Sequence, residues 1–539
     1  MSDISQKNRR VVGRILFGIS ATWVQSIVAV LTNLVQIPLF YRYLARDTLG
    51  AWMIFASLGL FLLLWDMGLG VTFARSMAYF RGTRESGSTI ALKPPATPAE
   101  SPQDMIKTVS LTYWILAAAL YTMGLAAGRI YLGQLEFDTT PFGTVWLAWI
   151  IYSFGCAVNL GAITPFHCLS GVGDVGIEQS LQTVCNLVAL LANIIILVAG
   201  GGIVELSLVF VARGFAARAA AWFILKRRHP WLFAQKGRFS RSCLRAIRGD
   251  CVRIFITRLG AFLILQTPGL VIAQFLTPKR VPDFMAMWMI MQLGMIGGTA
   301  IGQAVTPFAA TAYATGDGER ILRLHRNAAS ASLFLLGLWS VGFIVWGQQV
   351  FALWIGPGHF LGYSVLLPML ITGTLEVHHS INSNFVWSSG QWPFAPWAIA
   401  AGILNLGLGI WWVHVAGEAG MAWATCIAQL ATNNWFGVYY ALRVLRVSLR
   451  EYALRVVSPV AVIVAVSAVA AVGIKEGLLN SVNLAGKFRG VPATEVLALV
   501  AGSLVVVTFA AALFWRFGMD AEGRRALRFH LQRLAMRGV

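Results

Sequence analysis

The hydrophobic positions of this chain fall into long continuous runs separated by short polar segments. About 20 apolar residues cross the hydrocarbon core of a bilayer as an α-helix, and fourteen runs reach that length. Twelve of them form two sets of six, at 12–42, 49–80, 107–129, 142–168, 178–199 and 203–225, and then at 251–276, 284–312, 325–350, 363–388, 393–415 and 418–442. Two more follow at 453–474 and 494–517. The pattern predicts an all-α integral membrane protein with about 14 transmembrane helices.

Composition agrees with lipid as the solvent for much of the chain. Of its 539 residues, 57% are hydrophobic and only 12% are charged, whereas a soluble protein carries roughly a quarter charged residues. The formal net charge of +20 would suit nucleic acid, but the basic residues lie in short loops between apolar runs. Such residues act as topology signals and contact anionic headgroups. We expect the lipid bilayer as a partner and no nucleic acid.

The basic residues also predict the orientation of the chain. If the fourteen segments alternate across the bilayer, 29 lysines and arginines fall on one side and 8 on the other. The richer side is cytoplasmic by the positive-inside rule, so both termini are predicted to be cytoplasmic. The outside loops are short, and the largest, 475–494, offers only Glu476 and no histidine. A membrane polysaccharide polymerase or ligase needs catalytic groups there, so we expect no enzyme and assign no catalytic residue.

A basic segment after the sixth run divides the chain. We predict an N-terminal six-helix lobe at 1–228, a basic cytoplasmic linker at 229–250, a C-terminal six-helix lobe at 251–447, and a terminal helix pair with a basic tail at 448–539. A weak internal repeat supports two halves, because YLARDTLGAWMI (43–54) is similar to FLTPKRVPDFMAMWMI (275–290). Six helices per half would give both halves the same orientation. Chance similarity between apolar segments is the alternative.

The cysteines carry no predicted chemistry. None falls in a loop predicted to be outside, and none shows metal-ligand spacing with histidines. We interpret them as small packing residues within helices and expect no metal or cofactor; they are Cys156, Cys168, Cys185, Cys243, Cys251 and Cys426.

Three stretches of the sequence resemble a known transporter family. The first is IPLFYRYLARDTLGAWMIFASLGLFLLLWDMGLGVTFARSMAYF (37–80), whose most specific part is a D-x-G-L-G run followed by A-R, with Asp66, Gly68, Gly70 and Arg75. The others are HRNAASASLFLLGLWSVGFIVWGQQVFALWIG (325–356) and GAITPFHCLSGVGDVGIEQSLQ (161–182). They are similar to Wzx-like polysaccharide flippases of the multidrug/oligosaccharidyl-lipid/polysaccharide (MOP) exporter superfamily. The loop at 81–106 is longer and richer in proline than this resemblance suggests, so its role stays open.

The resemblance implies a fold and a function. The fold would be two six-helix lobes in a V around a central cavity, with the terminal helix pair of the fourteen-helix members. The function would be to move a polyprenyl-pyrophosphate-linked oligosaccharide from the cytoplasmic to the periplasmic leaflet of a bacterial inner membrane, by alternating access, for cell-surface or exopolysaccharide assembly. Implied partners are H+ or Na+ as a coupling ion and a polysaccharide polymerase, and the protein would be a monomer.

Arginines inside the predicted helices are candidates for binding the pyrophosphate. A charge at the bilayer centre costs about 2.5–3.5 kcal/mol on insertion scales, and a guanidinium pairs bidentately with phosphate oxygens. Arg213 lies close to the predicted midplane, and Arg218 lies in the inner half of the same helix. Structural ion pairing or snorkelling is the alternative. Three further candidates, at the inner half of helix seven, the cytoplasmic mouth and the outer end of helix one, are Arg258, Arg75 and Arg42.

Acidic and histidine residues within helices are candidates for gating or cation coupling. Asp66 lies midway along the second run, within WDMGLG, where two glycines loosen the helix. Bonding to freed backbone groups or an ion pair with an arginine would also explain it. Glu376, His378 and His379 lie near the middle of helix ten and could exchange protons during transport. A polar packing cluster is the alternative for these three.

Four amide side chains complete the predicted site. Gln266, Gln274, Asn382 and Asn384 could hydrogen-bond sugar hydroxyls, although bonding between helices would equally explain them. A multidrug or small-molecule antiporter of the same superfamily is the main alternative function. Exporters of cationic drugs need acidic cavities, whereas the charged residues near the middle of the predicted helices are more often basic than acidic.

Overall fold

The computed structural model describes residues 2–66, 68–86, 101–391, 393–518 and 524–525. Most of the proline-rich 81–106 loop and of the predicted basic tail lies outside these residues. The chain forms two compact units: residues 1–262 with 276–282, and residues 263–275 with 283–539. The predicted lobes and linker stay a prediction.

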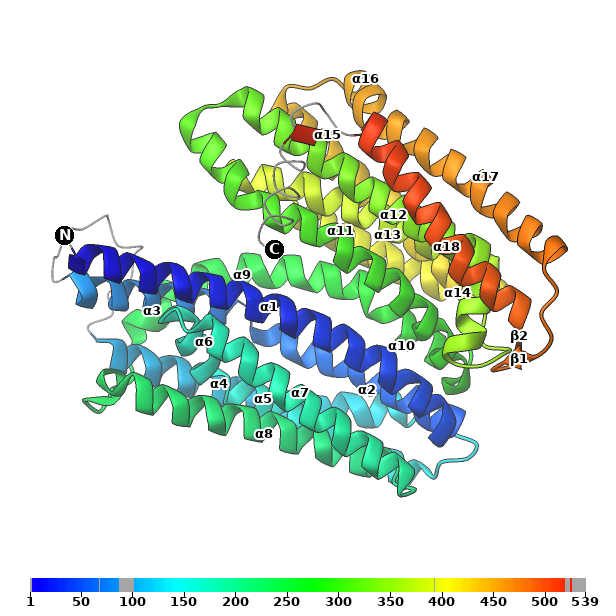
Figure 1. The fold of residues 1–539 in the computed structure, drawn as a ribbon. Helices are drawn as coiled ribbons and strands as arrows, with labels where there is room; N and C mark the ends of the chain where they lie inside the picture. The colour runs from blue at the N-terminus through cyan, green and yellow to red at the C-terminus, as the bar shows by residue number, and fades with distance from the viewer. Residues whose placement is uncertain (1, 67, 87–100, 392, 519–523, 526–539) are drawn as a thin grey trace. The chain divides into compact units, whose positions relative to one another are not determined.

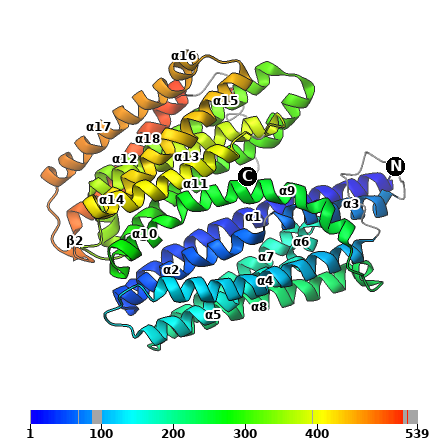
Figure 2. The ribbon, with the colours of Figure 1, turned by 180° about the vertical axis from the view of Figure 1, so that it is seen from behind.

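The first unit is a bundle of helices (Figure 1). Helix α1 packs along α7, and α5 packs along both α4 and α8, as the views from front and back agree (Figure 2). In chain order its elements are α1 (Ser2–Tyr43), α2 (Arg46–Leu63), the 3-10 turn η1 (Leu64–Asp66), α3 (Leu69–Ser86), α4 (Pro102–Leu132), α5 (Phe142–Gly161), α6 (Thr164–Gly171), α7 (Val175–Val198), α8 (Ile203–Arg228), the turn η2 (Pro230–Phe233) and α9 (Arg241–Leu265), of which residues up to 262 belong here.

The second unit contains a further bundle, in which α12 packs against α13 and α17, and α17 against α18. A two-residue antiparallel hairpin, β1–β2, joins α17 to α18. Its elements are α10 (Thr267–Phe275), α11 (Val281–Thr315), α12 (Gly318–Trp354), α13 (Tyr363–Ser388), α14 (Ala395–Gln429), the π-turn η4 (Leu430–Asn434), α15 (Trp435–Leu445), α16 (Leu449–Tyr452), η5 (Ala453–Val457), α17 (Ser458–Ser481), β1 (Lys487–Phe488), β2 (Val491–Pro492), α18 (Ala493–Leu513) and η6 (Phe514–Gly518). The turn η3 (Pro278–Arg280) belongs to the first unit.

The chain is an all-α, multi-pass membrane protein, as predicted. Eleven of the described helices are long and apolar enough to cross a membrane, or twelve if the bent pair Phe255–Leu265 and Thr267–Phe275 forms one span. Many large apolar side chains on these helices are exposed, as lipid-facing residues must be. The predicted count of fourteen spans is not confirmed.

The difference in span count has two physical causes. The two predicted segments at 393–415 and 418–442 lie in one continuous apolar stretch, whose helix is interrupted at Ala416 and by Gly417, with a φ of 56°. Helix α13 forms as predicted but is not among the candidate spans, because Glu376 and the adjacent histidines lower its hydropathy.

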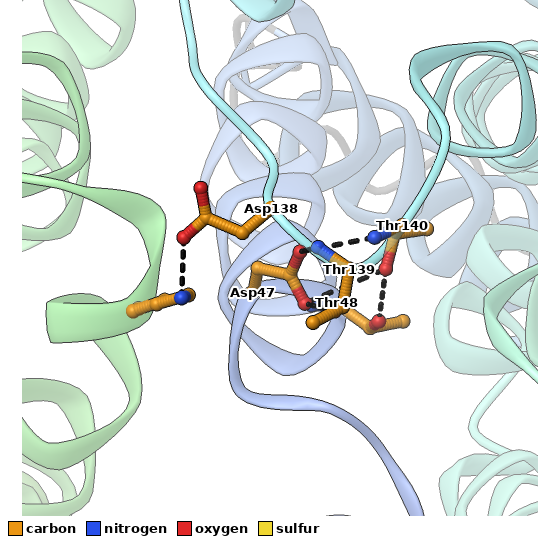
Figure 3. Close-up of polar contacts among 6 residues, drawn as sticks. Asp47, Thr48, Asp138, Thr139 and Thr140 are labelled. Atoms are coloured by element: carbon orange, nitrogen blue, oxygen red, sulfur yellow. Dashed lines mark hydrogen bonds and ion pairs between the residues drawn. The ribbon is translucent and has the colours of Figure 1, made fainter.

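The first turn of α2 anchors the loop that follows α4 (Figure 3). The Asp47 carboxylate accepts hydrogen bonds from the backbone N–H groups of Thr139 at 2.7 Å and Thr140 at 3.1 Å, and also from the Thr139 hydroxyl. In the same loop, Asp138 forms an ion pair with Lys279 of η3. The buried Asp47 is thus satisfied by several donors, which offsets the cost of its desolvation and fixes the loop on α2.

Candidate functional site

The D-x-G-L-G segment forms a break between α2 and α3. Gly68 adopts a φ of 75°, which is easily reached only by a residue without a side chain. Helix α2 and its 3-10 turn η1 therefore end at Asp66, and α3 begins at Leu69. The Asp66 carboxylate accepts a hydrogen bond from the Tyr113 hydroxyl at 2.5 Å and another from the backbone N–H of Gly70 at 3.3 Å. The break thus holds a carboxylate in place between α3 and α4.

The same carboxylate forms an ion pair with Arg258 of α9. The Arg258 Nη1 donates to Asp66 Oδ2 at 3.1 Å. Arg258 is 43% exposed and Asp66 only 14% exposed, so the arginine reaches the pair from the more accessible side. Asp66, predicted as a gating residue, and Arg258, predicted as a phosphate contact, therefore lie together. The ion pair with an arginine that was an alternative for Asp66 is present.

Gly70 allows an aromatic imidazole to lie directly against α3. A Cβ atom at position 70 would collide with the His167 ring. His167 also stacks on Tyr113, with ring centres 6.0 Å apart, and its buried Nε2 has no hydrogen-bond partner among the described residues. The motif therefore positions both Asp66 and His167.

Beyond His167 a polar cavity of about 320 Å³ lies between α6, α7 and α8. Arg213 and Arg218, the two arginines predicted to bind the pyrophosphate, both line this cavity. Arg213 Nη1 donates to Asn186 Oδ1 at 2.9 Å, and Arg218 Nε donates to the Asn159 carbonyl at 2.9 Å. Its lining also includes His167, Glu178, Gln182 and Cys185.

Neither guanidinium is neutralised by a carboxylate within the described part of the chain. Arg218 bonds only carbonyl oxygens, and Arg213 bonds an amide oxygen. Both lie near aromatic rings, at 5.5 Å from the centres of Phe210 and Phe166. Glu178 lines the same cavity, but its carboxylate accepts from the Ser170 hydroxyl instead. Two partly buried positive charges without a counter-ion create a cavity that favours an anion.

Helix α7 supplies a polar face that the sequence analysis missed. Its residues at 178, 182, 186 and 193 are Glu, Gln, Asn and Asn, and all four line cavities in this unit. The exposed apolar residues Val184, Val188, Leu191, Ile195 and Val198 form the opposite stripe. Both stripes follow helical spacing. Polar residues repeating every four positions in an otherwise apolar run were the available signal.

Glu376 of α13 lies in a second polar cluster, in the second unit. Its side chain faces Gln429 of α14, and His379 faces Asn433 in the π-turn η4. Glu376 Oε2, both amide atoms of Gln429 and the Asn433 Oδ1 are buried and have no hydrogen-bond partner among the described residues. Buried oxygens without hydrogen bonds destabilise a fold. Short π-helical segments such as η4 are frequent at functional sites.

The other predicted residues of α13 are tied into the bundle. His378 Nε2 is 2.5 Å from the Tyr452 hydroxyl. Asn382 is fully buried, with its Oδ1 2.9 Å from His325 Nε2 and its Nδ2 donating to the His378 carbonyl at 2.7 Å. This network supports the alternatives given for these residues, which are polar packing at His378 and bonding between helices at Asn382. His379 is buried in contact with Ser383.

The remaining candidates are dispersed. Arg42 is exposed at the end of α1, and Arg75 is exposed on α3. Gln266 lies at the break between α9 and α10, Gln274 lies on α10, and Asn384 lies on α13. Their predicted roles in contacting phosphate or sugar stay predictions.

Comparison with known proteins identifies the fold. No family model matches the chain, and no curated protein matches it in sequence. It is similar to the lipid II flippase MurJ in an inward closed conformation, with a TM-score of 0.63 and 13% identity over 93% of this chain and 99% of that one. It is also similar to an inward-facing multidrug resistance MATE transporter of the MOP superfamily, with a TM-score of 0.60 and 14% identity over 80% and 98%.

A third similar structure is that of the MATE multidrug transporter DinF-BH, with a TM-score of 0.54 and 14% identity over 80% of this chain and 95% of that one. Identities at this level concern the fold alone. The predicted resemblance is confirmed at that level: the chain has the fold of MOP-superfamily transporters.

Proposed function

We propose that this chain is a flippase for a polyprenyl-pyrophosphate-linked oligosaccharide, which it moves from the cytoplasmic to the periplasmic leaflet of a bacterial inner membrane. The observation that carries the proposal is the cavity lined by Arg213 and Arg218, whose guanidinium groups have no carboxylate partner among the described residues. Each guanidinium can pair bidentately with phosphate oxygens. A pyrophosphate would thus supply the counter-charge that the protein itself does not.

The orientation and mechanism follow from the same proposal. The excess of basic residues on one side favours cytoplasmic termini, so the cavity would load from the cytoplasm. Alternating access would carry the charged head group through the protein while the polyprenyl tail stays in lipid, with the protein acting as a monomer. A polysaccharide polymerase would then use the translocated product.

Coupling to an ion gradient is assigned to the cluster around Glu376. A carboxylate and neutral amide oxygens are the ligands that suit H+ or Na+, and here three residues, Glu376, Gln429 and Asn433, hold buried oxygens without partners among the described residues. A cation bound there would satisfy them together.

The alternative is a small-molecule antiporter, since multidrug transporters share the fold. The arginines without a carboxylate partner in the described part of the chain argue against cationic cargo, because a cation would be repelled from a cavity of the same charge. The two functions differ in what the purified protein moves, so one assay separates them.

The test uses the full chain in lipid vesicles with a fluorescent polyprenyl-pyrophosphate oligosaccharide, whose outer-leaflet fraction is read by a membrane-impermeant quencher. Arg213→Gln should slow translocation at least about tenfold, since a hydrogen bond to a charged group is worth about 1.5–3 kcal/mol. The matched control is Arg227→Gln, at the exposed C-terminal end of the same helix, which should keep the wild-type rate.

Two results would overturn the proposal. Movement of an organic cation by the wild-type chain, without movement of the lipid-linked sugar, would establish the antiporter. Translocation by Arg213→Gln at the wild-type rate would remove the cationic cavity from the mechanism.

A further inference from the structure

A second cavity adjoins the cationic one within the first unit. It has a volume of about 190 Å³ and lies between α1, α2, α7 and α8. Arg213 and Asn186 line both cavities, so the two spaces meet at the guanidinium that we assign to the pyrophosphate. Among the described residues, its lining contains no charged side chain other than Arg213. This second space is therefore polar but nearly neutral.

Helix α1 turns its uncharged polar residues toward this cavity. Thr32, Asn33 and Gln36 line it together and fall on one face of the helix by their spacing. The Thr32 hydroxyl is buried without a hydrogen-bond partner, and neither amide is bonded to another described residue. Amides and hydroxyls in a membrane helix normally bond to a neighbouring helix. These three lie beside open space instead.

Helix α7 adds a buried polar residue that also faces the cavity without a hydrogen-bond partner among the described residues. Asn193 is only 8% exposed, it lines the cavity, and its Oδ1 has no partner among the described residues. A buried amide oxygen without a partner destabilises the protein, because it has lost its bonds to water and gained none in return. A ligand that brings hydroxyl groups would satisfy Asn193 and the side chains of α1 at once.

Aromatic rings form another wall. Trp52 and Phe210 line the cavity. Tyr152 stacks on Phe210 with ring centres 4.3 Å apart and also meets Trp52 edge-on at 5.5 Å. These contacts hold the two lining rings in fixed orientations. Fixed apolar faces combined with a few convergent polar groups are typical of a site for a small ring-shaped ligand.

We infer that this cavity is a neutral-sugar subsite, which takes the first sugar ring attached to the pyrophosphate held at Arg213. The inference rests on the proposed function. Amides and a hydroxyl from α1 and α7 bond the sugar hydroxyls, and the rings of Trp52 and Phe210 cover its apolar face. A volume of about 190 Å³, equal to that of about six water molecules, gives room for one sugar ring. Sharing Arg213 places the sugar directly beside the phosphate.

The subsite should discriminate between polyprenyl pyrophosphate with a sugar and the same lipid without one. Sites built to hydrogen-bond a hydroxyl strongly reject an analogue that lacks it, because their polar groups are then left unpaired. The vesicle assay therefore compares polyprenyl pyrophosphate carrying one neutral sugar with bare polyprenyl pyrophosphate. The wild-type chain should move the sugar-bearing lipid at least about tenfold faster, which corresponds to about 1.4 kcal/mol.

Substitutions in the subsite should abolish this preference without stopping transport. Asn193→Leu and Gln36→Leu should slow the sugar-bearing lipid about tenfold and leave the rate for bare polyprenyl pyrophosphate unchanged. Arg213→Gln should slow both lipids. The control is Val188→Ala, on the exposed apolar face of α7, which should change neither rate. Gln36 lies on α1, which has few buried side chains, so Gln36→Leu should fold even if Asn193→Leu does not.

The outcomes separate the subsite from the proposed function. If neither lipid moves, the proposed function fails and the subsite with it. If both move at equal rates, the flippase stands and the subsite is wrong, the cavity then holding only water or a lipid chain. An equal loss for both lipids in Gln36→Leu, with the fold intact, would also overturn the subsite, because Gln36 would then act on transport in general.

Discussion

The Asp66 carboxylate and the Arg258 guanidinium form an ion pair at 3.1 Å, joining the break between α2 and α3 to α9. The two residues are 192 positions apart. Because Arg258 is 43% exposed, water screens the pair, so we expect it to contribute about 0.5–1 kcal/mol to stability. Its larger effect should be on transport, since it fixes α9 against the Asp66 turn.

We therefore predict strong coupling between the two positions in transport. Asp66→Asn and Arg258→Gln should each slow translocation, and the double variant should be no slower than the worse single variant. The vesicle assay gives the three rates, and thermal unfolding in detergent checks the fold. Strictly multiplicative effects of the two substitutions would show that the pair does not act as a unit.

A methyl group at position 70 should disrupt the site. Gly70→Ala places a Cβ atom against the His167 ring, and overpacking of this kind costs typically about 1–3 kcal/mol. We expect a lower melting temperature and slower translocation. The control is Gly82→Ala on the same helix, where a Cβ meets no other atom within 4 Å; it should be neutral or slightly stabilising. Equal melting temperatures for the two variants would contradict the close contact.

The sequence predicted the helical membrane class well, because lipid demands long apolar runs whatever the tertiary structure. It was less successful where one run contains two elements. Gly68 ends a helix that hydropathy alone continues to residue 80, and Ala416 and Gly417 interrupt a continuous apolar stretch. Backbone conformation at a few residues makes these differences, and hydropathy does not record it.

The candidate site could be predicted only in part. Arg213 and Arg218 were found because a charge within a membrane helix is energetically costly and usually marks a functional site. The pairing of Asp66 with Arg258 could not be found, because it depends on packing between elements far apart in the sequence. Asn193 was missed because a neutral amide carries a weaker signal than a charge, and its importance follows only from its burial and its place beside a cavity.

Glu376 should be required for coupling and not for translocation itself. Glu376→Gln removes the only charge among the three coupling residues Glu376, Gln429 and Asn433, so a cation should bind far more weakly. We predict that an ion gradient accelerates the wild-type chain and has no effect on Glu376→Gln, whose rate without a gradient is unchanged. A sodium gradient at equal pH and a proton gradient without sodium are tested separately.

The control for this prediction is Thr374→Val on the same helix. Among the described residues, the Thr374 hydroxyl bonds only the carbonyl one turn earlier, so the gradient response should survive its loss. A wild-type response of Glu376→Gln to both gradients would show that the coupling site lies elsewhere.

Asp174, in the turn between α6 and α7, should contribute stability that depends on pH. Burial alone would raise the pKa of this carboxyl, but hydrogen bonds from His229 and Arg228 and the charge of Arg228 hold the pKa below its usual value. A group with a lowered pKa stabilises the fold above its unfolded value, about 3.9, and this stability is lost as the pH falls through the folded pKa.

We therefore expect Asp174→Asn to lower the free energy of unfolding at neutral pH by an amount on the order of 1–3 kcal/mol, and the melting temperature with it. The difference from wild type should stay constant down to about pH 5 and shrink below about pH 4. Glu136→Gln, at an exposed carboxylate, should show no such dependence. A difference that stays constant down to about pH 3 would mean that Asp174 acts through packing alone.

Asp47 and Asp283 provide a test of the internal repeat. Each lies near the start of a long helix, and each precedes a tryptophan by five positions, Trp52 and Trp288. Asp47 binds the loop between α4 and α5, and Asp283 Oδ1 lies 2.9 Å from Nδ1 of His359, in the loop between α12 and α13. In both places, a carboxylate near the start of a helix thus contacts a later loop, as the predicted repeat would require.

If this correspondence is a shared structural device, the two aspartates should have equivalent local effects. Asp47→Asn should speed backbone hydrogen exchange in residues 133–141, and Asp283→Asn should do so in residues 355–362, each leaving the other loop unchanged. Both should lower stability by about 1–3 kcal/mol, since each loses hydrogen bonds to a charged group. Exposed Asp138→Asn should cost less than about 1 kcal/mol. Faster exchange in both loops from either variant would indicate a general loosening of the fold and not two matching anchors.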